Sequence, residues 1–127
     1  MADGLKANNR FFKESYGPRI NVAVLDTGIF RHRDFDNRIV AFKDFVNGKN
    51  VVYDDSGHGT HVSGIIAGNG FSSRGKYRGI APMAGIVSVK VVDERGNGKI
   101  EDVVQYFNKL SPTEKEKCIH ILQNKYM

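Results

Sequence analysis

The sequence predicts an α/β fold in which helices pack on both faces of a parallel sheet. Residues 20–25 form a short, nearly continuous apolar run, which suits a strand that is buried on both faces. Residues 57–67 carry apolar side chains at helical spacing, and residues 86–92 form a second apolar run. Strands that alternate with helices along a chain imply a parallel sheet with helices packed against it.

The first half of the chain is expected to contain an arm, two strands and a helix. Residues 1–19 are mostly polar and end near a Gly-Pro break, so we expect a separate N-terminal arm. Residues 20–25 form the first strand, and residues 39–46 form a second strand before an Asn-Gly turn. The helix at 57–67 follows the capping residues Asp-Asp-Ser and ends at Gly-Asn-Gly, residues 68–70.

The second half is expected to contain one strand and two helices. Residues 86–92 form the strand, and apolar spacing predicts a helix over 100–110. Ser-Pro-Thr-Glu at 111–114 has a proline at the first helical position and a capping-box glutamate. We therefore expect a last helix over 111–125, whose inward face carries residues at helical spacing: Cys118, Ile119 and Leu122.

Composition narrows the class of protein. The chain has 127 residues, which suits one domain or less, and a net charge of +5. It contains no dense Lys/Arg run with interleaved aromatic residues, so we expect no nucleic-acid partner. No apolar stretch approaches the roughly 20 residues of a membrane span, so no membrane partner is expected. A single cysteine excludes an internal disulfide, and a cytoplasmic location is the expectation.

Asp26 and His58 are the candidate catalytic residues. Asp26 follows the first predicted strand, and functional groups collect at the carboxyl ends of parallel strands. His58 lies at the entrance of the predicted helix, where a carboxylate can orient its imidazole as a general base toward a hydroxyl. By spacing alone, a strand-end aspartate is more often a helix cap or a turn former, so the pattern leaves both interpretations open.

Five segments resemble motifs of the subtilisin-like serine proteases and occur in the order of that family. They are Val-Ala-Val-Leu-Asp-Thr-Gly-Ile (22–29), His-Arg-Asp-Phe (32–35), His-Gly-Thr-His-Val-Ser-Gly (58–64), Tyr-Arg-Gly-Ile-Ala-Pro (77–82) and Val-Lys-Val-Val-Asp (89–93). The resemblance covers about 20–104 and implies a three-layer parallel sheet of subtilisin type. It also implies a serine-type endopeptidase that hydrolyses peptides or proteins, with Asp26 as the orienting acid and His58 as the general base.

Residues 96–100, Gly-Asn-Gly-Lys-Ile, resemble the family segment that pairs with the substrate backbone. The resemblance implies that Gly96, Asn97 and Gly98 bind substrate and that Ile100 lines an apolar side-chain pocket. An extended peptide can add to such an edge as a further strand. Without the resemblance, a plain turn between a strand and a helix is the simpler interpretation.

The nucleophile expected from the resemblance is missing. The family carries it in a Gly-Thr-Ser-Met-Ala string, and no such string occurs in this sequence. We therefore expect an arm at 1–19, a partial and incomplete peptidase domain at 20–104, and a divergent helical tail at 105–127. The expected partners are a peptide or protein substrate and a chain that supplies the missing C-terminal half. The alternative is a non-catalytic peptide-binding or interaction fragment.

Two other kinds of site receive less support. His58 and His61 share a helix face and, with Asp54 or Asp55, would give zinc the three protein ligands of a catalytic site. The glycine-rich segment 68–70 is not a phosphate-binding loop, because it follows a helix and lacks the Lys-Ser/Thr ending.

Calcium is common in the family that this sequence resembles, and Asp34 matches a family calcium ligand. The loop at 69–78, however, carries three basic residues, which do not suit a divalent cation. The expectation is therefore no metal site and no cofactor.

Overall fold

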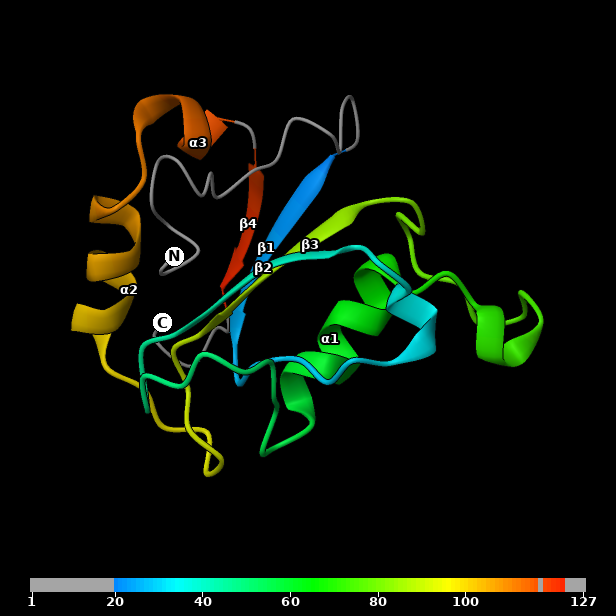
Figure 1. Cartoon of the computed structure of the whole chain (residues 1–127), viewed down its shortest axis with the longest axis horizontal. Coiled ribbons are helices and arrows are strands. Elements are labelled where there is room, and N and C mark those ends of the chain that lie inside the picture. Colours follow the sequence, from blue (N-terminus) through cyan, green and yellow to red (C-terminus); the bar gives the residue numbers. More distant parts are fainter. Residues whose placement is uncertain (1–19, 117, 123–127) are drawn as a thin grey trace.

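The computed structural model describes residues 20–116 and 118–122 and shows a parallel sheet between helices (Figure 1). The sheet has four strands in the order β2-β3-β1-β4, and all three pairings are parallel. The strands are β1 (Asn21–Asp26), β2 (Ile39–Asp44), β3 (Gly85–Lys90) and β4 (Cys118–Leu122). The predicted α/β class is confirmed, and the predicted arm at 1–19 lies outside the described residues.

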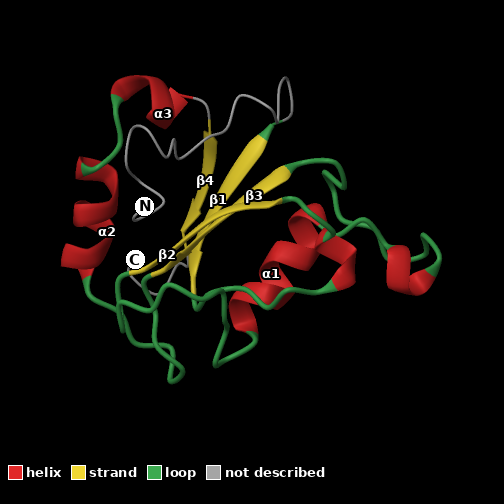
Figure 2. Ribbon diagram, viewed as in Figure 1, coloured by secondary structure: helices red, strands yellow, loops and turns green. Residues whose placement is uncertain are grey.

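The helices lie on opposite faces of the sheet. Helix α1 (His58–Ala67) covers one face and α2 (Ile100–Asn108) covers the other, which gives the three predicted layers (Figure 2). A short helix, α3 (Pro112–Glu116), follows α2, and two 3-10 turns, η2 (Arg33–Phe35) and η3 (Phe71–Ser73), lie beside each other near α1.

The side chains of β1 alternate between two apolar cores, one on each face of the sheet. Ala23 and Leu25 pack in the core that contains Tyr106 of α2. Val22 and Val24 pack in the core on the α1 face. All six residues of β1 are buried, which is the physical reason why its sequence is a nearly continuous apolar run.

The predicted start of the last helix is confirmed. The Ser111 hydroxyl accepts from the backbone N–H of Glu114 at 3.1 Å, and the Glu114 carboxylate accepts from the backbone N–H of Ser111 at 2.9 Å. This reciprocal pair is the capping box that the Ser-Pro-Thr-Glu sequence predicts.

The predicted continuation of that helix is wrong, and with it the description of 105–127 as a wholly helical tail. Helix α3 ends at Glu116, and β4 (Cys118–Leu122) pairs in parallel with β1, Asn21 opposite Cys118 and Leu25 opposite Leu122. Ile119 is 53% exposed rather than inward-facing. The reason is tertiary: β1 offers a free backbone edge, and pairing with it outweighs the local preference for helix. Residues 123–125 lie outside the described part of the chain.

The close approach of α1 to the end of β1 requires glycine at position 59. A Cβ atom there would lie well inside van der Waals distance of the Gly28 carbonyl oxygen and 3.1 Å from Thr27 Oγ1. Gly64 is also within α1, but a Cβ there meets no atom within 4 Å. The two glycines of one helix therefore serve as a matched pair.

We expect Gly59→Ala to destabilise the chain by about 3 kcal/mol, because the added methyl forces α1 away from β1. Gly64→Ala is expected to stabilise it by roughly 0.5–1 kcal/mol, since alanine loses less backbone entropy in a helix. Urea unfolding of both variants measures these changes. Equal effects of the two substitutions would contradict the packing argument.

Candidate active site

The structure brings Asp26 and His58 into direct contact. The distance from His58 Nδ1 to Asp26 Oδ1 is 2.9 Å. Asp26, the last residue of β1, is buried, whereas the side chain of His58 at the start of α1 is 50% exposed. Because a carboxylate only accepts hydrogen bonds, the proton of a neutral imidazole lies on Nδ1 and Nε2 keeps a lone pair. The contact thus occupies Nδ1 and leaves Nε2 of a half-exposed side chain able to accept a proton.

The backbone fixes the position of the Asp26 carboxylate. The backbone carbonyl oxygen of Asp26 accepts from the backbone N–H groups of Val91 and Val92 at 3.0 and 3.2 Å, just beyond the end of β3. Its Oδ1 accepts from the backbone N–H of Thr27 at 2.7 Å. The carboxylate is therefore held by its own chain before any contact with the histidine.

Asp54 fixes the start of the helix that carries His58. Its Oδ1 accepts from the Thr27 hydroxyl at 2.8 Å and from the backbone N–H of Gly57 at 2.9 Å. Its Oδ2 accepts from the backbone N–H of Thr60 at 2.9 Å and from the Thr60 hydroxyl. The N-cap residue of α1 is Gly57, which has no side chain to cap the helix. Asp54 instead accepts from the first turn and joins it to the end of β1 through Thr27.

The same hydrogen bonds act on the acidity of Asp54. Burial alone would raise the pKa of its carboxyl group, but the bonds from Thr60, Gly57 and Thr27 outweigh burial and lower that pKa below its usual value. Because the pKa of Asp54 is lower in the folded chain than in the unfolded chain, its ionised carboxylate stabilises the fold. This stabilisation is complete at a pH above the unfolded pKa, and it is lost as the pH falls through the folded pKa.

We expect the free energy of unfolding to fall as the pH drops below about 4, the pKa of an unfolded aspartate. Asp54→Asn should cost about 1 kcal/mol at neutral pH and should flatten this acid dependence. Urea unfolding of the wild-type chain and of Asp54→Asn between pH 6 and pH 3 measures this dependence of the free energy of unfolding on pH. Some slope should remain, because hydrogen bonds also lower the pKa of Asp44 despite its burial. Parallel loss of stability in both proteins would contradict the role of Asp54.

The structure does not bring together the ligands of the alternative zinc site, which were His58 and His61 with Asp54 or Asp55. Asp54 uses both carboxylate oxygens as hydrogen-bond acceptors, and Asp55 forms an ion pair with Lys90 at 2.8 Å. Among residues 20–116 and 118–122, no group of three or more His, Cys, Asp or Glu side chains is placed to hold a metal ion. His61 lies on the exposed side of α1.

The donors near Asp34 do not fit a calcium ion. Its Oδ1 accepts from the backbone N–H of Ser72 at 2.8 Å and lies 3.7 Å from His32 Nδ1. The Asn69 side-chain oxygen accepts from the backbone N–H of Phe71 at 2.8 Å. Calcium requires six to eight oxygen ligands, and the two side-chain oxygens named here already accept backbone hydrogen bonds. The expectation of no cofactor stays a prediction, and no chemical step below depends on a metal.

The predicted substrate-binding residues lie in a turn that follows β3. Gly96 has a positive φ of 85°, and Asn97 is held by Asp93, whose backbone N–H donates to the Asn97 carbonyl at 2.8 Å. Gly98 forms an isolated antiparallel bridge with Val92. Ile100 begins α2 and is 53% exposed.

This turn is at the same edge of the sheet as Asp26, since Val92 N also donates to the Asp26 carbonyl. Substrate binding by the turn stays a prediction. A cavity of about 650 Å³ lies elsewhere, between α1 and the loop before β3, and its lining includes His61, Ile65 and Tyr77 but none of the predicted site residues.

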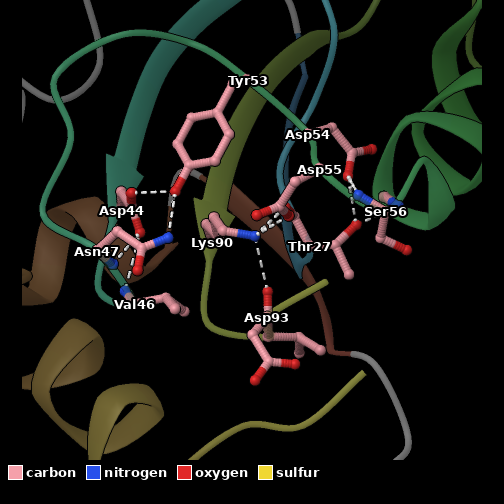
Figure 3. Close-up of polar contacts among 12 residues, drawn as sticks. Thr27, Asp44, Val46, Asn47, Tyr53, Asp54, Asp55, Ser56, Lys90 and Asp93 are labelled. Carbon is pink, nitrogen blue, oxygen red and sulfur yellow. Dashed lines mark hydrogen bonds and ion pairs between the residues drawn. The ribbon is translucent and has the colours of Figure 1, made fainter. Parts of the chain in front are cut away.

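Sequence reasoning missed two residues that hold this site together. The Thr27 hydroxyl donates to Asp54 and also accepts from the backbone N–H of Gly59 at 2.8 Å. Lys90 is fully buried beside Thr27, Asp55 and Val92 (Figure 3). A signal for Lys90 existed: it is the one charged residue within the predicted strand at 86–92.

Comparison with known proteins points to one family. The model of the Subtilase family matches residues 17–121. Serine protease AprX of Bacillus subtilis is 48% identical over 89 residues, which cover 70% of this chain and 20% of that protein. The Major intracellular serine protease of the same organism is 41% identical over 110 residues, which cover 82% of this chain and 34% of that protein.

Solved structures agree with the sequence comparison. A cold-adapted subtilisin-like serine proteinase matches with a TM-score of 0.60 and 33% identity, over 71% of this chain and 31% of that one. The CspB protease of Clostridium perfringens matches with a TM-score of 0.64 and 26% identity, over 82% of this chain and 28% of that one. The chain thus spans about a third or less of the relatives named here. Within its described part, no helix has the length and apolar character needed to cross a bilayer.

Proposed function

This chain belongs to the subtilase family, and on that premise we propose that it supplies the acid and base of a serine endopeptidase site. Asp26 orients the imidazole of His58 and stabilises its protonated form. His58 accepts a proton from a serine hydroxyl through Nε2 and later gives it to the leaving amine. The observation that carries this proposal is the 2.9 Å contact between His58 Nδ1 and buried Asp26, with the ring half exposed.

The described residues do not place a nucleophile against this base. The serine hydroxyl nearest in sequence, that of Ser56, accepts from the backbone N–H of His58 at 3.4 Å rather than contacting the ring. A general base without a nucleophile cannot form an acyl-enzyme. The proposed enzyme therefore needs a serine and an oxyanion hole from a segment outside residues 20–122, on the same polypeptide or on a partner chain.

The proposed substrate is an extended peptide or protein. The turn with Gly96, Asn97 and Gly98 lies at the edge of the sheet that carries Asp26, where a peptide strand could pair beside the base. Ile100 is exposed next to this turn and would contact a substrate side chain. A cytoplasmic location also stays a prediction, supported by the name of the intracellular protease among the relatives.

The test is reconstitution from two parts. The full chain is mixed with the separately produced C-terminal part of a subtilase, which carries the nucleophilic serine. Hydrolysis of a fluorogenic peptide and labelling of that serine by a fluorophosphonate are measured for each part and for the mixture. We expect neither part alone to turn over the peptide and the mixture to do so. Turnover by the chain alone would contradict the need for a serine from another segment. An inactive mixture whose parts sediment together would contradict the assignment of Asp26 and His58 and would favour a non-catalytic binding fragment.

A further inference from the structure

A buried lysine lies at the carboxyl edge of the sheet. The ammonium group of Lys90, the last residue of β3, donates to the Thr27 carbonyl at 2.7 Å, to Asp55 Oδ1 at 2.8 Å and to the Val92 carbonyl at 3.0 Å. Its side chain is fully buried. An ammonium group has three N–H donors, so these three acceptors satisfy it completely. Figure 3 shows the group facing Thr27 and Asp55.

Two of these acceptors border the candidate catalytic residues. Thr27 follows Asp26 directly, and its backbone N–H donates to Asp26 Oδ1, the atom that contacts His58. Asp55 lies three residues before His58, in the segment that enters α1. One buried cation thus joins the residue after the acid to the segment before the base.

Consecutive carboxylates attach this segment to two neighbouring strands. Asp54 binds the Thr27 hydroxyl at the end of β1, and Asp55 binds Lys90 at the end of β3. The bridge between Asp54 and Gly28 and the bond from the Gly59 N–H to the Thr27 hydroxyl also join this segment to the end of β1. The Asp55–Lys90 pair adds an attachment to β3, and attachments to two strands restrict the direction in which α1 begins.

A contribution to folding stability alone does not explain why a buried ion pair such as Lys90–Asp55 is present. Burial of an ammonium group has a desolvation cost, and replacing a buried ion pair with apolar residues of similar volume is often neutral or stabilising. What well-packed apolar residues do not reproduce is the fixed geometry of three hydrogen bonds from one atom.

We propose that Lys90 is a positioning residue for the Asp26–His58 pair. Its ammonium group holds the end of β1 and the entry to α1 at one separation, and so keeps His58 Nδ1 directed at Asp26 Oδ1. The catalytic importance of this role rests on the proposed function. The effect of Lys90 on the contact between His58 and Asp26 can be tested without measuring turnover.

The test measures the His58 imidazole by NMR in the full chain. Labelled side-chain nitrogen reports which tautomer is present and how fast the Nδ1 proton exchanges with water. Asp55→Asn removes the charged acceptor at a partly exposed position, and Lys90→Met removes all three bonds. Asp36→Asn is the matched control, because Asp36 also pairs with a buried cation, Arg38. Asp36 contacts Asn69, which lies beyond the end of α1 opposite to His58.

We expect wild type and Asp36→Asn to show a protected Nδ1 proton, and Asp55→Asn and Lys90→Met to exchange it about tenfold faster or more. If Lys90→Met does not fold, Asp55→Asn decides alone, with circular dichroism as the check on its fold. An unchanged His58 signal in the folded variants overturns the role of Lys90 only. Equal change in all three variants also overturns it, since that is a general stability effect. A wild-type chain without the protected proton overturns the Asp26–His58 pairing as well.

Discussion

Replacing His58 with alanine is expected to lower peptide hydrolysis by the reconstituted enzyme on the order of a millionfold, a magnitude taken from subtilisin, a member of the same family. The physical reason is that the serine hydroxyl is a weak nucleophile until a base takes its proton. In this chain, the nitrogen available for that proton is Nε2 of His58, because Nδ1 is directed at Asp26.

His61→Ala is the matched control for that variant. It removes an imidazole from the same helix, at an exposed position with no contact to Asp26. Initial rates with the fluorogenic peptide are compared at equal concentrations of both parts, and sedimentation confirms that the variants still bind the C-terminal part. Loss of activity in both histidine variants, or in neither, would contradict the assignment of His58 as the base.

The strands and helices up to residue 110 were predictable because their signals are local. Residues 20–25 are apolar without a break, and both faces of β1 are buried in the structure. Asp26 and His58 were singled out because each lies in a string that resembles a motif of the family; their places at a strand end and a helix start alone left a structural role open. Neither inference needs to know which strands pair with which.

Strand β4 was not predictable in the same way. Cys118 and Leu122 are four residues apart, a spacing that places them on one face of either a helix or a strand. His120 distinguishes the two: it lies with them on one face of β4, and its Nε2 is 3.1 Å from the Tyr106 hydroxyl on α2. Strand β4 pairs with β1, which lies about three quarters of the chain length earlier in the sequence, so no local pattern reports the pairing.

The contacts of Lys90 also depend on tertiary structure. A lysine within an apolar run signals either an exposed strand end or a buried and paired ammonium group, and the sequence does not choose between them. The choice follows from three segments that meet only in the fold, at Thr27, Asp55 and Val92.

Asp26→Asn is expected to lower the rate of the reconstituted enzyme by about ten-thousandfold, roughly a hundredfold less than His58→Ala, as in serine proteases with this arrangement, subtilisin among them. The asparagine fits the same space, but it carries no charge to stabilise the imidazolium ion. Its amide N–H₂ also favours the tautomer with the proton on Nε2, which cannot accept the serine proton. A rate within tenfold of wild type would show that Asp26 is a structural residue.

The double variant shows whether Asp26 acts through His58. If the only role of Asp26 is to orient and stabilise that imidazole, its replacement changes nothing once the imidazole is gone. Asp26→Asn combined with His58→Ala should therefore be no slower than His58→Ala alone, and the two losses should not multiply. A further hundredfold loss or more in the double variant would mean that Asp26 also acts elsewhere, for example by holding the end of β1 through its contact with Thr27. The same comparison, made with rates at saturating and at low peptide concentration, separates an effect on the chemical step from one on substrate binding.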